Sequence, residues 1–234
     1  MSPPALQPER VERLSPASGE AGGRLKITEI FRSLQGESDS VGWPTVFVRL
    51  TGCPLRCHYC DTAYAFHGGA WKSLDEIVGT VRDLATRHVC VTGGEPLAQK
   101  PVLTLMTRLS DAGHAVSIET SGALDISGID RRVRRVMDLK TPDSGEVARN
   151  RWENLSDLRM EDEVKFVICS RADYDWANQM IDQHRLLART RVLYSPSADQ
   201  LPAHQLADWI LEDRREVRFQ TQLHKALWGA TPGR

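Results

Sequence analysis

Three cysteines, Cys53, Cys57 and Cys60, fall on one short stretch of the chain and could bind a metal centre together. A structural zinc site normally takes four ligands, often including a second Cys/His pair further along the chain, and this sequence has no such pair at a suitable spacing. Three thiolates on a cubane iron–sulfur cluster leave one iron without a protein ligand, where a substrate or cofactor can bind. The spacing therefore favours a 4Fe–4S cluster over zinc or a chance grouping of cysteines.

A second candidate is the turn Gly93-Gly94-Glu95, which follows the short apolar stretch His88–Thr92. Glycine lets the backbone approach a ligand closely, and a carboxylate can accept hydrogen bonds from an ammonium group. Taken alone, these residues could equally form an ordinary turn between a strand and a helix. Because the turn accompanies the cysteine stretch, we interpret it as part of a ligand site.

The elements that must position these residues alternate between strands and helices. Strands are expected at Lys26–Phe31, Pro44–Leu50, His88–Thr92, Ala115–Glu119, Arg135–Leu139, Glu163–Ile168, Arg191–Tyr194 and Val217–Thr221, and helices at Ser73–Arg87, Pro101–Asp111, Ala172–Leu187 and Leu201–Asp213. This alternation is typical of parallel β/α units, in which the turns after the strands share one rim. About six units are too few for a closed eight-stranded barrel. The sequence thus predicts an α/β fold with a partial, open parallel β/α barrel.

Composition restricts the class of partner. The chain has 234 residues, with 30 Lys+Arg against 31 Asp+Glu, and this balance gives no electrostatic footprint for nucleic acid. No apolar run approaches the roughly 20 residues of a membrane helix, and no signal peptide is apparent at the start. We therefore expect a cytoplasmic protein with no nucleic-acid or membrane partner.

Two segments are assigned from their composition. Residues 1–23 are rich in Pro, Ser, Glu and Gly and are expected to be a mobile leader, with residues 24–234 forming a single catalytic domain. The basic run Arg131–Arg135 is interpreted as a solvated helix face ahead of a strand. Cys90 and Cys169 lie in apolar strands and are expected to be buried packing residues.

The cysteine spacing, with Tyr59 just before the third cysteine, resembles the radical S-adenosylmethionine (SAM) superfamily. The segment Val91–Pro96 matches the Gly-Gly-Glu-Pro motif of that superfamily. The resemblance implies that the amino and carboxylate groups of SAM chelate the open iron. It places Gly93, Gly94 and Glu95 around the amino group.

A narrower resemblance, from Lys26 onward, is to the 7-carboxy-7-deazaguanine synthase family. The matching stretches are Ser33–Glu37, Phe47–Cys53, Cys60–Thr62, Glu119–Gly122, Asp138–Pro142, Lys165–Val167 and Gln220–Lys225. The resemblance implies a lyase of queuosine and deazapurine biosynthesis. In this reaction a 5′-deoxyadenosyl radical from SAM starts the ring contraction of 6-carboxy-5,6,7,8-tetrahydropterin to 7-carboxy-7-deazaguanine, with loss of ammonia.

The same resemblance assigns roles to individual residues. Residues expected to contact the pterin are Leu34, Gln35, Gly36, Glu37, Arg49, Thr92 and His224. Further residues expected around SAM are Tyr59, Ser121, Asp138, Lys140 and Gln222. A guanidinium such as that of Arg49 suits a carboxylate, because it can bind both oxygens. Thr62 is expected to give one oxygen to Mg²⁺, with the substrate and water supplying most of the remaining ligands.

Partners and rival functions complete the sequence-based hypothesis. A reducing donor such as flavodoxin or ferredoxin is expected, together with a homodimer that covers the edges of an open barrel. One rival is an activating enzyme for glycyl-radical proteins, which shares both motifs but acts on a protein. The other is a non-catalytic iron–sulfur redox protein, which would have no need for the Gly-Gly-Glu turn.

Overall fold

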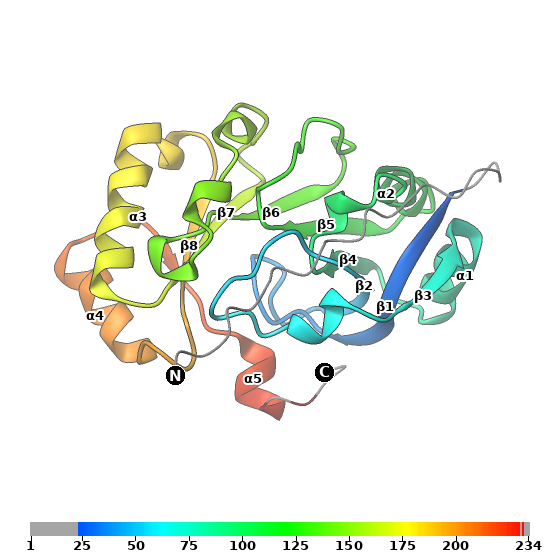
Figure 1. The fold of residues 1–234 in the computed structure, drawn as a ribbon, viewed down its shortest axis with the longest axis horizontal. Coiled ribbons are helices and arrows are strands. Elements are labelled where there is room, and N and C mark those ends of the chain that lie inside the picture. The colour runs from blue at the N-terminus through cyan, green and yellow to red at the C-terminus, as the bar shows by residue number, and fades with distance from the viewer. Residues whose placement is uncertain (1–22, 230, 232–234) are drawn as a thin grey trace, which may run out of the picture.

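One curved sheet of nine strands organises the molecule (Figure 1). The computed structural model describes residues 23–229 and 231, so the expected leader lies outside the described residues except for Gly23. The strands are β1 (Arg24–Leu34), β2 (Pro44–Leu50), β3 (Ala70–Ser73), β4 (His88–Gly93), β5 (Ala115–Thr120), β6 (Arg134–Asp138), β7 (Glu163–Ile168), β8 (Arg191–Pro196) and β9 (Arg218–Phe219). Their order across the sheet is β3-β1-β2-β4-β5-β6-β7-β8-β9.

The direction of the strands divides the sheet into two parts. From β2 to β9 every neighbouring pair is parallel, as β/α units require. β1 runs antiparallel to both β2 and β3. Across the described strands, β3 and β9 remain the two outer edges and the sheet does not close. The predicted open, partial barrel is therefore confirmed, with an antiparallel addition at its beginning.

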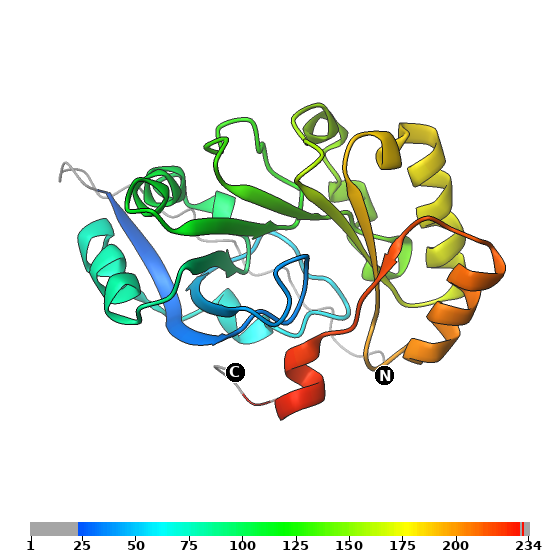
Figure 2. The same cartoon turned by 180° about the vertical axis from the view of Figure 1, so that it is seen from behind.

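Five α-helices accompany the sheet: α1 (Leu74–Asp83), α2 (Val102–Asp111), α3 (Arg171–His184), α4 (Ala203–Glu212) and α5 (Leu223–Trp228). Both views show α1 and α2 near one end of the sheet and α3 and α4 near the other (Figure 2). Buried apolar side chains of the strands and these helices form one core. Within the described residues, none of these helices has the length and apolar character needed to cross a lipid bilayer.

Alternation along the parallel strands decides which side chains face the inside of the barrel. In β7, Val164, Phe166 and Ile168 are fully buried in the core. The intervening Lys165 and Val167 instead line a central cavity. Successive side chains of a strand point to opposite faces, so each strand has one column in the core and one column in the barrel interior. These interior columns carry the polar residues described below.

The first helix forms largely as its sequence indicates. The Ser73 Oγ accepts from the Glu76 amide at 3.2 Å, and the Ser73 amide donates to Glu76 Oε2 at 2.6 Å, so the two residues form a capping box. The helix ends at Asp83 rather than at Arg87. Ala85 adopts a left-handed conformation with φ of 49°, which breaks the helix earlier than its apolar pattern indicates.

The prediction for the basic run Arg131–Arg135 is wrong. The run forms a turn and the first residues of β6, and the Arg135 side chain is buried rather than solvated. Its guanidinium donates to the Asp157 and Ile129 carbonyls and lies 3.3 Å from Asp162 Oδ2. An arginine can be buried in this way because nearby acceptors replace its water shell.

Asp162 connects the turns at the start of β6 and β7. Its carboxylate is fully buried and accepts from the Arg135 amide at 3.0 Å and from both the amide and the guanidinium of Arg159. A buried charge that loses its compensation is strongly unfavourable. The network therefore ties these two strands together where each of them begins.

We expect Asp162→Asn to lower the free energy of unfolding by about 3–5 kcal/mol, because it leaves Arg135 buried without its counter-charge. Urea denaturation of the metal-free protein measures this change. Asp182→Asn is the matched control, because Asp182 pairs with Arg215 on the surface and should contribute about 1 kcal/mol or less. Equal losses in the two variants would contradict the role given to Asp162.

Candidate active site

A central cavity of about 710 Å³ gathers most of the residues that the sequence singles out. The predicted site residues that line it are Leu34, Gln35, Glu37, Arg49, Cys53, Cys57, Tyr59, Cys60, Thr62, Thr92, Gly93, Gly94, Ser121, Asp138, Lys140, Gln222 and His224. Among the described residues, Gly36 and Glu95 belong to the predicted set but do not line the cavity. These residues lie far apart in the sequence, so the fold creates the site.

The cysteine loop follows β2 directly and is fixed to the rest of the rim. The Gly52 amide donates to the Ala65 carbonyl at 2.8 Å, and the Cys60 amide donates to the Cys57 carbonyl at 3.2 Å. The His58 amide bonds to the Ser144 carbonyl at 3.0 Å, which joins the loop to the segment after β6. Cys53, Cys57 and Cys60 are all free thiols and partly exposed to the cavity.

Burial and neighbouring charges act on Cys53 and Cys57 of the cysteine loop. Burial raises the pKa of Cys57 to about 11 and also raises that of Cys53, while the Lys140 ammonium acts in the opposite direction on both. The charge of Cys60 raises both pKa values as well, so the three sulfur atoms lie within electrostatic range of one another. Thiolates gathered in this way are compensated when a metal centre binds them.

The arrangement of the three thiols is compatible with a cubane cluster. Within the part of the chain that the structure describes, no three His, Cys, Asp or Glu side chains gather tightly enough to bind one metal ion. A cubane offers a separate iron to each thiolate, so the three sulfur atoms need not meet at one point. The Cys53–Cys60 loop is therefore suited to a cluster that spans it.

Gly93 and Gly94 are required by the close approach of the β4 turn to the cysteine loop. Gly93 has φ of 146°, and a Cβ there would lie 2.3 Å from the Leu50 carbonyl oxygen. A Cβ on Gly94 would lie 2.3 Å from the Gly52 carbonyl oxygen. Any larger residue would push the turn away from the cysteines, which explains the two glycines without reference to a ligand.

Glu95 has a different place from the one that the resemblance implied. It is fully buried, and its carboxylate accepts from the Leu97 amide at 3.0 Å, the Ser121 amide at 2.7 Å and the Thr120 hydroxyl at 2.9 Å. The Ser121 hydroxyl donates to it as well, at 2.5 Å. With its acceptor positions taken, Glu95 connects the turn after β4 to the turn after β5 and has no free oxygen for SAM.

Two lysines and two carboxylates form a charged network across the barrel interior. Lys140 Nζ lies 3.1 Å from Asp138 Oδ2, and Lys165 Nζ lies 2.7 Å from Glu37 Oε2 and 3.7 Å from Asp138 Oδ2. Burial alone would lower the pKa of Lys165, but the charges of Glu37 and Asp138 outweigh it and raise that pKa. The pKa of Lys140 is raised in the same way and that of Glu37 is lowered, so these two groups and Lys165 remain ionised at neutral pH.

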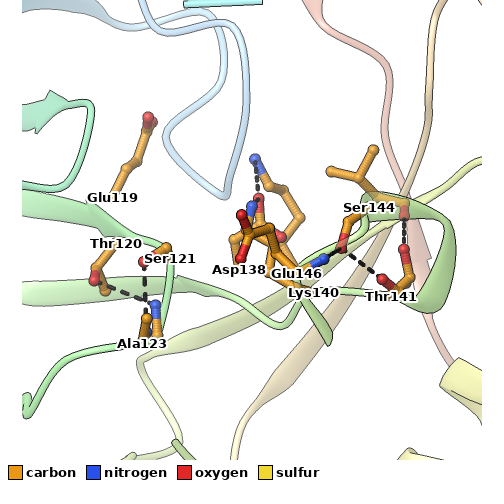
Figure 3. Close-up of polar contacts among 12 residues, drawn as sticks. Glu119, Thr120, Ser121, Ala123, Asp138, Lys140, Thr141, Ser144 and Glu146 are labelled. Atoms are coloured by element: carbon orange, nitrogen blue, oxygen red, sulfur yellow. Dashed lines mark hydrogen bonds and ion pairs between the residues drawn. The ribbon is translucent and has the colours of Figure 1, made fainter. Parts of the chain in front are cut away.

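Figure 3 shows Asp138, the last residue of β6, together with Lys140, and Ser121 in the turn that follows β5. Two polar atoms near this point, Tyr59 Oη and Asp138 Oδ1, are buried and have no hydrogen-bond partner within the described residues. Buried polar atoms are rarely left unpaired in folded proteins. The Tyr59 hydroxyl and the Asp138 carboxylate therefore offer hydrogen-bonding atoms to a polar ligand in this part of the cavity.

Arg49 lines the cavity and also forms an ion pair. Its Nε lies 2.7 Å from Glu29 Oε1, and its guanidinium carbon lies 5.8 Å from the ring centres of Phe31 and Tyr64. Glu29 therefore occupies one edge of the guanidinium. The other nitrogen atoms remain available to an anion, because an arginine side chain has five N–H groups.

The C-terminal helix α5 and the residue before it contribute Gln222, His224 and Lys225 to the lining of the cavity. Gln222 Nε2 donates to Glu37 Oε1 at 2.8 Å and to Asp61 Oδ2 at 3.0 Å. The Leu223 amide donates to the Gly36 carbonyl at 3.0 Å. Gly36 is needed here because a Cβ on it would lie 2.1 Å from His224 Nδ1.

Thr62 lies beside the third cysteine and is oriented by its neighbour. Its hydroxyl donates to Asp61 Oδ1 at 2.8 Å, and Asp61 in turn lies 3.1 Å from Lys225 Nζ. With the hydroxyl proton directed at Asp61, the Thr62 oxygen keeps its lone pairs for another group. A single neutral oxygen is a weak magnesium site unless a ligand supplies further oxygens.

Several cavity residues were not predicted. The lining residues that sequence reasoning left out of the site include Phe31, Phe47, Tyr64, Asp61, Glu119, Lys165 and the segment 195–200. Phe31 and Phe47 stack with their ring centres 5.1 Å apart and form an apolar wall. Glu119 and Lys165 lie in inward-facing positions of their strands, so strand alternation was the signal that could have identified them.

Comparisons with known proteins agree with this geometry. A family model for the Radical SAM superfamily matches residues 47–144, which include the cysteine loop and the Gly-Gly-Glu turn. A 7-carboxy-7-deazaguanine synthase from Chlorobaculum tepidum is 42% identical over 207 residues, covering 87% of this chain and 94% of that protein. The synthase from Koribacter versatilis is also 42% identical, over 219 residues, covering 87% of this chain and 97% of that protein.

A solved structure shows the same fold. The crystal structure of QueE from Escherichia coli superposes with a TM-score of 0.69 and covers 86% of this chain and 95% of that chain. The two sequences are 23% identical. This similarity supports the architecture.

We expect Glu95→Gln to lower the free energy of unfolding by about 2–3 kcal/mol, because the new amide group must face donors and leaves a buried N–H unpaired. Urea denaturation of the metal-free protein measures the change. Glu153→Gln, at an exposed position, serves as the control and should have little effect. If Glu95→Gln is as stable as the control, the connection between the two turns does not depend on this carboxylate.

Proposed function

Because the chain belongs to the 7-carboxy-7-deazaguanine synthase family of the radical SAM superfamily, we propose that its cavity converts 6-carboxy-5,6,7,8-tetrahydropterin to 7-carboxy-7-deazaguanine. The reaction contracts the ring and releases ammonia. One observation carries the proposal: the cysteine loop and the polar side chains of Gln35, Glu37 and Arg49 line the same cavity. A radical formed beside the cysteines would therefore arise next to a molecule bound by these three residues.

Cys53, Cys57 and Cys60, whose thiols line the cavity, would hold the 4Fe–4S cluster. When bound, the reduced cluster and SAM supply the 5′-deoxyadenosyl radical that abstracts a hydrogen atom from the substrate. The Gly93-Gly94 turn lets a ligand approach the backbone beside the cysteines. Tyr59, with its unpaired hydroxyl, and the charged residues Asp138 and Lys140 border the space in which the rest of SAM would lie.

Further SAM contacts come from the turns on either side. Ser121 lines the cavity beside Asp138, and Gln222 reaches it from the segment before α5. Glu95 takes part only indirectly, by holding Ser121 in place through its two hydrogen bonds. Ser121 and Gln222 would therefore contact the ligand, whereas Glu95 would fix the shape of the turn that contacts it.

Arg49, Gln35 and Glu37 would recognise the pterin from the other side of the cavity. The free N–H groups of Arg49 suit the substrate carboxylate. Gln35 Nε2 lies 3.3 Å from Glu119 Oε1, so an amide and a carboxylate are presented together to a heterocycle edge. The Thr92 hydroxyl also donates to Glu119, at 3.0 Å, so Gln35, Thr92 and Glu119 form one hydrogen-bonded group. Leu34 and His224 would contact the ring, and Gly36 would make room for His224.

Thr62 would supply one oxygen ligand to Mg²⁺. The hydrogen bond from Thr62 to Asp61 leaves the threonine oxygen free to act as a ligand, and hard cations of this kind prefer oxygen. Because the described chain offers so few oxygens at this point, binding of the ion would depend on bound substrate. Its positive charge would hold the carboxylate in a fixed direction during the rearrangement.

The cavity and α5 favour a small-molecule substrate over a protein substrate. Contacts of α5 and the preceding residue to Gly36, Glu37 and Asp61 cover part of the mouth, and such cover excludes water from reactive species. An activating enzyme for another protein would need this space open. A purely redox iron–sulfur protein would not need the group of Gln35, Glu37 and Arg49.

We also propose the remaining partners. A flavodoxin or ferredoxin would supply the electron, and a homodimer would cover the free edges at β3 and β9. We place the protein in the cytoplasm, because cysteine thiols stay reduced there and can assemble a cluster. The domain proposal is that residues 24–234 act as one catalytic unit.

The decisive experiment is anaerobic turnover by the reconstituted and reduced protein with SAM, Mg²⁺ and 6-carboxytetrahydropterin. We expect the deazaguanine product by absorbance and mass, and its complete loss in Cys53→Ala. Arg49→Ala should lower kcat/KM for the pterin roughly 10- to 100-fold, because a charge-assisted contact to the carboxylate is lost. Arg32→Ala, at an exposed position of β1, should be unchanged. Cleavage of SAM without any deazaguanine product would refute the pterin assignment.

Removal of the Thr62 hydroxyl should affect the metal rather than the fold. We expect Thr62→Val to raise the Mg²⁺ concentration for half-maximal activity by about tenfold, because one oxygen ligand is lost. Thr62→Ser keeps that oxygen and should behave like the wild type. The Mg²⁺ dependence of the initial rate distinguishes the two variants, and identical curves would remove Thr62 from the proposed metal site.

A further inference from the structure

The segment 35–43 connects β1 to β2 and forms what we call the floor loop. β1 is antiparallel to β2, so Leu34 lies beside Pro44 at the end of the barrel opposite the cysteine loop. The Gln35 amide donates to the Trp43 carbonyl at 2.9 Å, and the Gly42 amide donates to the Gln35 carbonyl at 2.8 Å. Residues 35–38 are buried, so the loop enters the barrel instead of extending into solvent.

The upper side of the floor loop presents two of the proposed substrate contacts. Gln35 donates to Glu119, and Glu37 accepts from Lys165 at 2.7 Å and from Gln222 at 2.8 Å. These partners belong to β5, to β7 and to the segment before α5. The position of Gln35 and Glu37 along the cavity therefore depends on the position of the floor loop relative to the sheet.

The lower side of the floor loop is anchored by Asp39. Its carboxylate forms ion pairs with Arg134 and, at 2.8 Å, with Arg191 Nη1. Its backbone amide donates to Glu163 Oε2 at 3.2 Å. Arg134, Glu163 and Arg191 are the first residues of the three neighbouring parallel strands β6, β7 and β8. One aspartate is therefore attached to the beginning of three strands.

Ser38 lies between the two sides and has an unusual backbone. Its φ is 66°, a left-handed conformation that residues with a side chain rarely adopt. The Ser38 amide donates to Gln220 Oε1 at 2.9 Å, and its hydroxyl lies 2.8 Å from the Ser40 hydroxyl. Such a conformation persists only when its surroundings fix it, and it reverses the chain between Glu37 and Asp39.

Building on the proposed function, we propose that Asp39, paired with Arg134 and Arg191, is a positioning residue for substrate binding. Asp39 is not among the residues that line the cavity. Its ion pairs hold the strained floor loop against the strand ends, and this fixes Gln35 and Glu37 at the height where they meet the pterin. The cofactor half of the cavity, built on the cysteine loop and the turns after β4 to β6, does not depend on this anchor.

The first test needs no turnover. Hydrogen exchange followed by mass spectrometry compares the peptide that covers residues 35–43 in the reconstituted wild-type protein and in Asp39→Asn. We expect at least a tenfold faster exchange in the variant, because the Ser38 and Asp39 amides lose their fixed acceptors. Asp130→Asn, which removes the pairing of Asp130 with Arg132 outside the cavity, is the matched control and should leave the peptide unchanged. Unchanged exchange in Asp39→Asn would overturn the proposal, whether or not the proposed reaction occurs.

The second test separates substrate from cofactor. In Asp39→Asn we expect about a tenfold higher KM for 6-carboxytetrahydropterin, with the KM for SAM and the rate of substrate-free SAM cleavage within twofold of wild type. Arg191→Gln should change in the same direction by a smaller factor, and the double variant should fall short of the product of the two effects because the residues share one interaction. If the KM for SAM rises in parallel with the KM for the pterin, the substitution destabilises the whole cavity and the proposal is overturned. Effects of Asp39→Asn and Arg191→Gln that simply multiply in the double variant would also overturn it. A wild-type protein that makes no deazaguanine would instead refute the proposed function, and the exchange result would still decide the role of Asp39.

Discussion

Charged groups removed from water need compensating partners, and the interior of this barrel is built around that requirement. Lys165 is held between Glu37 and Asp138, and Lys140 pairs with Asp138 as well. These pairs link segments that are distant in the sequence, from the floor loop to the rim after β6. These ion pairs compensate the charges that are removed from water, and they also fix the shape of the cavity. A ligand that enters can exchange these partners for its own polar groups without creating an unpaired charge.

The strands distribute this chemistry in layers. Along β7, the inward column passes from Glu163 at the beginning, through Lys165, to Val167 near the rim. Arg134 and Asp138 occupy the first and last positions of β6, with Val136 between them. The interior therefore has an anchoring layer at the strand beginnings, a layer that faces the proposed substrate, and a rim that faces the cysteines. Every second residue of a strand faces the barrel interior, so successive inward-facing residues of one strand lie in successive layers.

The sequence predicted the cofactor half of this arrangement more fully than the substrate half. Cys53, Cys57 and Cys60 are close in sequence, and the glycines after β4 follow a recognisable strand, so local patterns identify both. Lys165 and Glu119 carry no local signal beyond alternation, and their importance appears only when the sheet places them opposite Glu37 and Gln35. Glu95 was assigned to SAM by motif, yet its hydrogen bonds to Leu97, Thr120 and Ser121 make it a structural carboxylate. The role of Asp39 depends on residues about 100 to 150 positions away, and no sequence period reports such a contact.

The contact between Gln222 and Glu37 joins residues that are 185 positions apart. Chains emerge from the ribosome beginning with the N-terminus, so the cysteine loop and most of the sheet exist before the segment that closes the mouth has been synthesised. Contacts of such long sequence separation are also slow to form. The order of biosynthesis therefore makes this contact a late one, because the cysteine loop is synthesised well before the segment that carries Gln222 and α5.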